Sequence, residues 1–245
     1  LYVNGAPFGK FINFDVRDPK LLNHLDGADV VIHLAGIAPL PDCQINPSSA
    51  YDNNVIGTLN VLESCRKKNI PKVIFSSTSA VYENCTSYPL IENKIDREPN
   101  LIYSMSKRSC ECICKSYIDN YQMNITTLRF FNVYGPHQDF KRKHPPLMGY
   151  ITKILLSGVT PTFYSTGKQK RDYVYIDDIS DLVRKVINNP DSRGEIFNVC
   201  SGEAYSVKEI YNLYCEHFDK YKQPIFEDSK KFWNKYPELF LYDYP

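Results

Sequence analysis

The chain of 245 residues is long enough to bury a sizeable core in one large or two small domains, which excludes a small disulfide-stapled module. Its 29 basic and 28 acidic residues leave a formal charge of +1, and no stretch gathers the positive charge that nucleic-acid binding needs. We therefore expect no nucleic-acid partner. The longest apolar runs also fall well short of the roughly 20 residues of a membrane helix, so we expect no membrane partner either.

Short apolar, β-branched runs alternate with longer amphipathic stretches along the chain. The short runs predict strands at 11–14, 30–34, 72–76, 125–131 and 196–199. The longer stretches predict helices at about 48–68, with Ser48 or Ser49 as its N-cap, and at 103–121, 178–189 and 206–220. This alternation predicts an α/β fold, a doubly wound parallel sheet with right-handed crossovers.

Proline and loop signals divide the chain. They increase over 134–171 and again after residue 200. We therefore predict a partial dinucleotide-binding domain formed by residues 1–133, to which 172–199 returns. The remaining stretches, 134–171 and 200–245, are predicted to form a smaller C-terminal substrate-binding lobe.

Doubly wound nucleotide folds normally begin with a strand, a glycine-rich turn and a helix, and no such turn occurs in this sequence. We interpret the sequence as a Rossmann-like fold that lacks its N-terminal βα unit and is truncated at its C-terminal end. An unusual, degenerate protein is the alternative.

The eight cysteines show none of the paired spacings that close a zinc site, so we expect no metal. Reduced thiols are typical of proteins from a reducing compartment. We therefore expect a cytoplasmic protein.

Tyr103 and Lys107 are four residues apart in a predicted helix, which places a phenol and an ammonium group on the same face. A tyrosine is about one part in a thousand ionised at pH 7, so its use as a base costs roughly 4 kcal/mol, which a nearby cation partly offsets. The hydroxyl-rich segment 75–82 follows a predicted buried strand, at the sheet edge where ligands bind. The alternative interpretation is an exposed helix face and a loop whose hydroxyls bind their own backbone.

These residues belong to a series of eight short motifs. In their sequence and order, the motifs resemble those of the extended short-chain dehydrogenase/reductase family, specifically its nucleotide-sugar epimerase/dehydratase branch. The motifs are Asp15-Val-Arg-Asp18, His33-Leu-Ala-Gly36, Asn54-Val-Ile-Gly-Thr58, Ser76-Ser-Thr78, Tyr103-x-x-x-Lys107, Arg129-Phe-Phe-Asn-Val-Tyr-Gly-Pro136, Arg171-Asp-Tyr-Val-Tyr-Ile-Asp-Asp178 and Phe197-Asn-Val-Cys-Ser-Gly202.

The resemblance implies a role for each matching residue. Tyr103 would be the catalytic acid and base, Lys107 would lower the pKa of Tyr103 and bind the nicotinamide ribose of NAD, and Thr78 would hold the reacting oxygen of the substrate. The other residues implied to contact NAD are Asp15, Val16, Leu34, Ala35, Gly36, Asn54, Ser76, Phe130 and Val133. Asn132 and Arg171 would bind the diphosphate of a nucleotide sugar, most simply a UDP-sugar.

The residues after Thr78 favour one reaction of this branch. Sugar dehydratases carry an Asp-Glu pair there, whereas this chain has Ser79-Ala80. A hydroxyl, a phenol and an ammonium suffice for an epimerase, which oxidises C4 of the sugar reversibly through a keto intermediate. The alternatives are a reductase or dehydratase of the same branch and a non-catalytic sugar-nucleotide-binding relative. Relatives often form homodimers through helices that correspond to 48–68 and 103–121, which we expect here as well.

Two positions depart from the family's pattern. Glu83 stands where the family usually has glycine, and no arginine follows residue 194, where many relatives place one over the diphosphate. The sequence therefore leaves the sugar, the nucleotide and the choice between NAD and NADP open.

Overall fold

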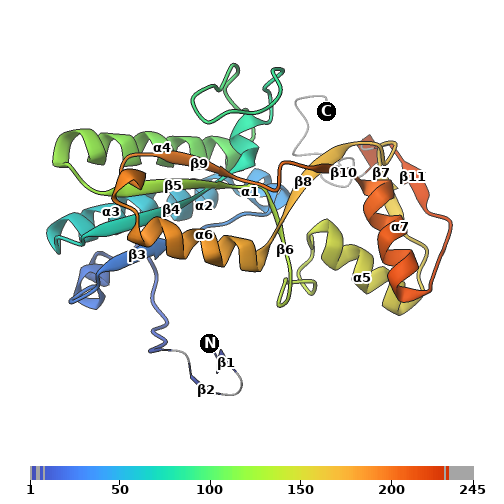
Figure 1. Cartoon of the computed structure of the whole chain (residues 1–245), viewed down its shortest axis with the longest axis horizontal. Coiled ribbons are helices and arrows are strands. Elements are labelled where there is room, and N and C mark those ends of the chain that lie inside the picture. The colour runs from blue at the N-terminus through green and yellow to red at the C-terminus, as the bar shows by residue number, and fades with distance from the viewer. Residues whose placement is uncertain (1, 4–5, 8, 229, 232–245) are drawn as a thin grey trace.

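A computed structural model describes residues 2–3, 6–7, 9–228 and 230–231 (Figure 1). Its central feature is a four-stranded parallel sheet with the order β3-β4-β5-β9. The strands are β3 (Val30–His33), β4 (Lys72–Thr78), β5 (Ile125–Phe130) and β9 (Ile196–Val199). This sheet confirms the predicted α/β, Rossmann-like fold class.

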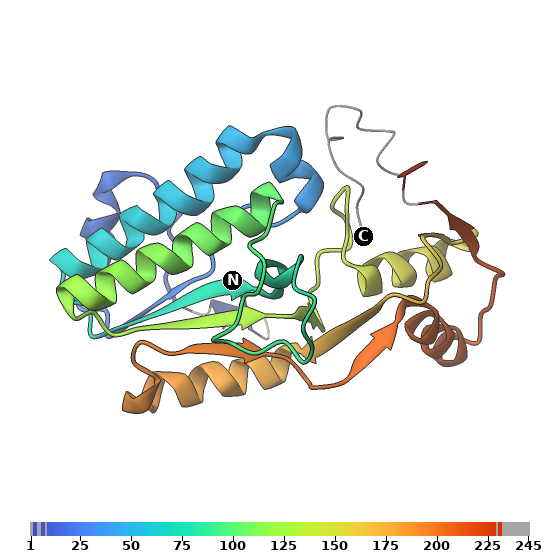
Figure 2. The same cartoon turned by 90° about the horizontal axis from the view of Figure 1, so that it is seen from above.

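Helices cover both faces of the sheet, as the near-continuous apolar sequence of its strands requires (Figure 2). On one face, α3 (Gly57–Lys67) and α4 (Ile102–Tyr121) share a core with Val73, Phe75 and Ile125. On the other face, α6 (Ile176–Asn188) packs with Ile74 and Leu128. Neighbouring residues of β4 point to opposite faces, so the strand period itself builds the two cores.

The helix that leads into α3 is not regular. It begins as α2 (Pro47–Tyr51), passes through a π-helical turn (Asp52–Ile56), and continues as α3. The prediction of Ser48 or Ser49 as its N-cap is wrong: the Asn46 side chain accepts a hydrogen bond from the Ser49 amide at 3.0 Å. Pro47 at the first helical position makes Asn46 the natural cap.

The predicted strand at 11–14 is also wrong. No strand is assigned there, and the side chain of Phe11 is 75% exposed. A short apolar run forms a strand only beside a neighbouring strand, and none of the described residues pairs with this segment.

A second group of elements lies at the carboxyl end of the sheet (Figure 1). A three-stranded sheet has the order β10-β8-β6. The elements are β6 (Asn132–Tyr134), α5 (Leu147–Ser157), β7 (Thr162–Tyr164), β8 (Lys170–Tyr175), β10 (Ala204–Ser206), α7 (Val207–Phe218) and β11 (Ile225–Glu227). Ile151, Phe163 and Tyr211 lie in the core of this group, between α5 and α7. Within the described part of the chain, no helix is both long and apolar enough to cross a membrane.

A buried ion pair fastens the sheet to α4. The guanidinium of Arg129 on β5 donates two hydrogen bonds of 2.8 Å to the carboxylate of Glu111 on α4, and both side chains are 1% exposed. The hydroxyl of Ser77 on β4 donates to the same carboxylate. This network fixes α4 against the strands that carry the candidate site.

Candidate active site

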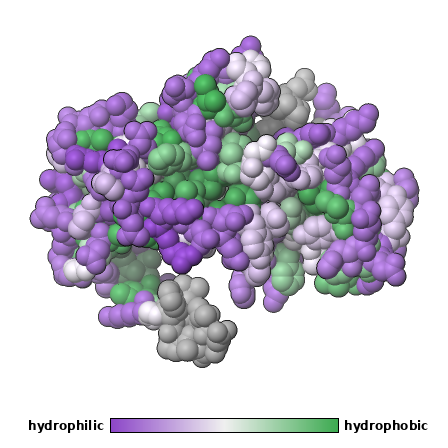
Figure 3. Space-filling view, in the orientation of Figure 1, coloured by the Kyte–Doolittle hydropathy of each residue, from purple (hydrophilic) through white to green (hydrophobic). Residues whose placement is uncertain are grey.

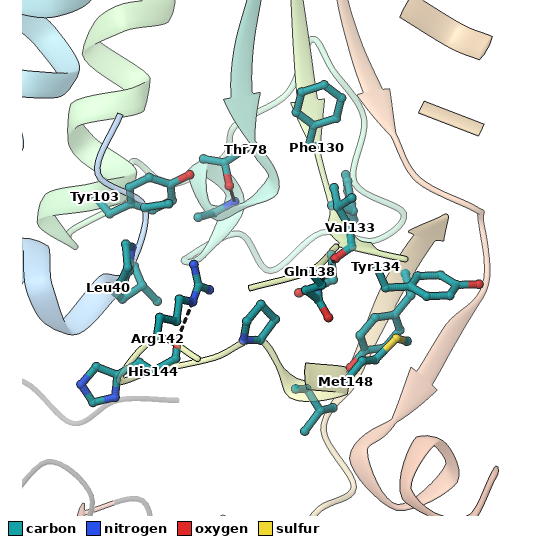
Figure 4. Close-up of a pocket in the computed structure, with 18 of the residues that line it drawn as sticks. Leu40, Thr78, Tyr103, Phe130, Val133, Tyr134, Gln138, Arg142, His144 and Met148 are labelled. Carbon is teal, nitrogen blue, oxygen red and sulfur yellow. Dashed lines mark hydrogen bonds between the residues drawn. The ribbon is translucent and has the colours of Figure 1, made fainter. Parts of the chain in front are cut away.

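A pocket of about 520 Å³ lies where the carboxyl ends of β4 and β5 meet the second group of elements (Figure 4). Six of the residues predicted to bind cofactor or substrate line it: Ser76, Thr78, Tyr103, Phe130, Asn132 and Val133. In the space-filling view, apolar side chains gather at the centre of the molecule, with hydrophilic surface on both sides (Figure 3). The sheet edge therefore presents a mainly apolar hollow with a few polar groups, which is typical of a small-molecule site.

In this pocket the Tyr103 phenol points toward Thr78, whose hydroxyl accepts a hydrogen bond from the Ala80 amide at 3.1 Å (Figure 4). Tyr103 lies in the first turn of α4, and Thr78 is the last residue of β4. Burial raises the pKa of the Tyr103 phenol, and the nearby Thr78 hydroxyl opposes that rise. The phenol is therefore protonated at neutral pH and can donate a proton to an oxygen placed between these two groups.

Lys107 lies one helical turn beyond Tyr103 and is 5% exposed. Its ammonium donates a 2.8 Å hydrogen bond to the Ser76 carbonyl oxygen and lies 5.1 Å from the centre of the Phe75 ring. Burial lowers the pKa of this ammonium. The lowering of the Tyr103 pKa by Lys107 stays a prediction, since burial is the largest influence on the phenol in this structure.

Asn54 holds the chain after β3 against α4. Its Oδ1 accepts from the Ile37 amide at 2.7 Å, and its Nδ2 donates to the Ile37 carbonyl and to the Ser106 hydroxyl. A Cβ atom on Gly36 would lie 2.9 Å from the Asn54 Oδ1 and 3.6 Å from the Lys107 Nζ. The absence of a side chain at Gly36 therefore allows the Asn54 amide and the Lys107 ammonium to lie close to the backbone after β3.

Four of the residues predicted to contact NAD, namely Asp15, Val16, Leu34 and Ala35, are not among those that line the pocket. Asp15 is exposed, and the Arg17 guanidinium lowers the pKa of its carboxyl group to about 2. Val16 lies against Gly57, which has no side chain to displace it. Leu34 follows β3 and is 64% exposed, and Ala35 beside it is half-buried.

Of the two residues predicted for the diphosphate, only Asn132 lines the pocket. Its Nδ2 donates to the Asp172 carbonyl at 2.8 Å and so ties β6 to β8. Arg171 is exposed and donates to the Lys170 carbonyl at 2.9 Å. The contact between Arg171 and substrate stays a prediction.

Glu83 caps the helix that carries Tyr103, a role that the sequence did not reveal. Its carboxylate accepts hydrogen bonds from the amides of Asn100 and Leu101 and from the Ser104 hydroxyl. The Leu101 side chain at the N-cap position provides no such bond. Glu83, which stands in place of the family's usual glycine, thus connects the loop after Thr78 to the start of α4.

Replacement of Glu83 by Ala should lower the free energy of unfolding by about 1–2 kcal/mol, because three donors at the start of α4 lose their acceptor. Urea denaturation measures this loss. Glu98→Gln is the control, since Glu98 lies in the same loop but forms only a partly exposed pair with Arg108 and should cost less than about 0.5 kcal/mol. Equal, small losses in both variants would show that the cap contributes nothing.

Comparison with known proteins assigns the family. The model of the NAD-dependent epimerase/dehydratase family matches residues 2–200. A putative UDP-glucose 4-epimerase from Methanocaldococcus jannaschii is 34% identical over 213 residues, which are 86% of this chain and 68% of that protein.

Two solved structures share the fold. A UDP-N-acetylglucosamine 4-epimerase from Methanobrevibacter ruminantium, in complex with UDP-N-acetylmuramic acid, has a TM-score of 0.84 and 29% identity, over 89% of this chain and 69% of the other. A UDP-glucose 4-epimerase from Thermotoga maritima, with UDP-glucose, has a TM-score of 0.82 and 29% identity, over 88% and 70%.

The parallel sheet, the helices on both of its faces and the pocket at its carboxyl edge define a Rossmann-like α/β protein. More narrowly, the chain belongs to the NAD-dependent epimerase/dehydratase family, whose cofactor is NAD. It spans about two thirds of the length of the curated relatives that it matches.

Proposed function

We propose that this protein is an NAD-dependent 4-epimerase of a nucleotide-diphosphate sugar. The observation that carries the proposal is that the Tyr103 phenol and Thr78 line the same pocket, with Lys107 one helical turn beyond Tyr103 (Figure 4). Among the described residues that line the pocket, none is Asp or Glu, so this part of the chain supplies no second acid–base pair for a dehydration. The nucleotide sugars bound by the two solved relatives support the same substrate class.

In this proposal, Thr78 holds the oxygen on C4 of the sugar while Tyr103 moves the proton. As the phenolate, Tyr103 would take the proton of the 4-hydroxyl during oxidation, and as the resulting phenol it would return this proton to the keto oxygen during reduction. NAD, when bound, would supply the acceptor and the donor of the C4 hydride, so no net consumption of the cofactor is expected. Inversion follows when the keto sugar presents its other face.

Lys107, Ser76 and Gly36 would hold the nicotinamide half of NAD, with Phe130 and Val133 against its ring. The other proposed contacts of NAD are Asp15, Val16, Leu34, Ala35 and the backbone that Asn54 positions. Asn132 and Arg171 are proposed for the diphosphate of the substrate, with 134–171 and 200–245 as the substrate-binding lobe.

We also propose a cytoplasmic homodimer. All eight cysteines are free thiols, as expected for a reducing compartment. The dimer would pair α3 and α4, which lie side by side, and the adjoining Ile56 and Leu59 are exposed apolar side chains.

Incubation of the full-length protein with NAD and a panel of UDP-hexoses tests the proposed reaction. We expect chromatography to show the C4-inverted sugar, with no net change in the amount of NAD. Stoichiometric consumption of NADH or NADPH would instead indicate a reductase. No inversion of any hexose would contradict the proposal.

A further inference from the structure

The candidate pocket contains one fixed positive charge. Among the described residues that line it, Arg142 alone is charged at every pH near neutrality, and none is acidic. His144 also lines the pocket, and burial lowers its pKa below the ordinary value of 6.5, so its imidazole is neutral at pH 7. The guanidinium of Arg142 points into the pocket toward Tyr103 and Thr78 (Figure 4).

The loop that carries Arg142 is held in place. The backbone amides of Lys141 and Arg142 donate to one carboxylate oxygen of Asp139, at 3.1 and 3.2 Å. The Nε of Arg142 donates to the His144 carbonyl oxygen at 2.7 Å. The direction of the guanidinium is therefore set by the loop before any ligand arrives.

The two terminal nitrogens of Arg142 remain available. The single hydrogen bond of its side chain within the described structure uses Nε, and the side chain forms no ion pair there. A half-buried guanidinium in a mainly apolar pocket is stabilised most by an oxyanion, and its paired N–H groups match the two oxygens of a carboxylate. The pocket is therefore built to receive a negative group.

We propose that Arg142 binds a carboxylate on the sugar, so that the substrate is a nucleotide sugar whose hexose carries a carboxyl group. This inference rests on the proposed function, because Tyr103 and Thr78 mark the place of C4. A carboxyl carbon at position 6 is attached to C5, the neighbour of C4. A sugar carboxylate therefore lies at the end of the pocket toward which Arg142 points, whereas the diphosphate is attached across the ring at C1.

Titration calorimetry with UDP-glucuronate and UDP-glucose tests this inference in the full-length protein. The two ligands share the nucleotide, the diphosphate and the ring, and differ in the group at C6. We expect the wild type to bind UDP-glucuronate more tightly. In Arg142→Met, the affinity for UDP-glucuronate should fall by about 10- to 100-fold and the affinity for UDP-glucose by less than about 3-fold.

Lys141→Met is the matched control. It removes the same charge from the same loop, but Lys141 is exposed and is not among the residues that line the pocket. The preference for UDP-glucuronate should survive in this variant, and its loss would show that Arg142 acts only through the general charge of the loop.

Calorimetry measures binding without turnover, so the two proposals fail separately. Binding of UDP-glucuronate through Arg142 with no C4 inversion would contradict only the proposed reaction. An equal loss of affinity for both ligands in Arg142→Met would place this residue on the diphosphate and overturn the inference. A wild type that does not prefer UDP-glucuronate, or does not bind it, would overturn it as well.

Discussion

Replacement of Tyr103 by Phe should lower the rate of C4 inversion by about 10²- to 10⁴-fold, which is the range for the loss of a positioned acid–base group. The variant removes the phenol oxygen and keeps the aromatic ring in the first turn of α4. Its affinity for the nucleotide sugar should change little, because the phenol is proposed to act on the proton and not to anchor the substrate. Steady-state kinetics and calorimetry on the full-length protein separate the two effects.

Tyr134→Phe is the control for this prediction. Tyr134 lines the same pocket but lies on β6, away from Thr78 (Figure 4). Its variant should retain the rate of inversion within a few-fold. A rate in Tyr103→Phe within tenfold of the wild type would show that another group moves the proton.

The second large effect concerns stability. Glu111→Ala should lower the free energy of unfolding by about 3–5 kcal/mol, because it leaves the buried guanidinium of Arg129 without its carboxylate. Ser77 loses its hydrogen-bond acceptor in the same variant. Chemical denaturation of the variant and the wild type gives the difference.

Glu63→Ala provides the comparison, since Glu63 pairs with Arg66 on the surface of α3 and should contribute no more than about 1 kcal/mol. The double variant Glu111→Leu with Arg129→Met should recover much of the lost stability, because no unpaired charge remains in the core. Equal losses for Glu111→Ala and Glu63→Ala would mean that the buried pair is not formed as described.

The parts of the fold that follow from local periodicity were predictable from the sequence. The helix with Tyr103 and Lys107 was predicted at 103–121 and is found at Ile102–Tyr121, and the strand before Thr78 was predicted at 72–76 and is found at Lys72–Thr78. A four-residue spacing fixes a helix face, and a buried strand fixes the sheet edge, so the two groups could be placed near each other. The run at 11–14 failed because a strand needs a partner, which local sequence does not reveal.

The contacts that the sequence did not reveal join residues that are far apart in the chain. Glu83 reaches Ser104 and the start of α4 across a loop, and Asn54 reaches the backbone of Ile37 from a π-helical turn. Arg142 lies in a basic segment that is typical of a solvated loop, and its direction depends on Asp139 and His144. Neither motif spacing nor composition predicts these contacts, because each depends on how its segment folds against the rest of the structure.

The position of the sugar in the pocket is the most direct test of the proposed chemistry. A crystal structure of the full-length protein with a nucleotide sugar should place the oxygen on C4 within about 3 Å of both the Tyr103 phenol and the Thr78 hydroxyl, with the ammonium of Lys107 beside the nicotinamide ribose. A sugar bound with C4 remote from both hydroxyls, or with Tyr103 shielded from it, would contradict the assignment of this pocket as the site of C4 inversion.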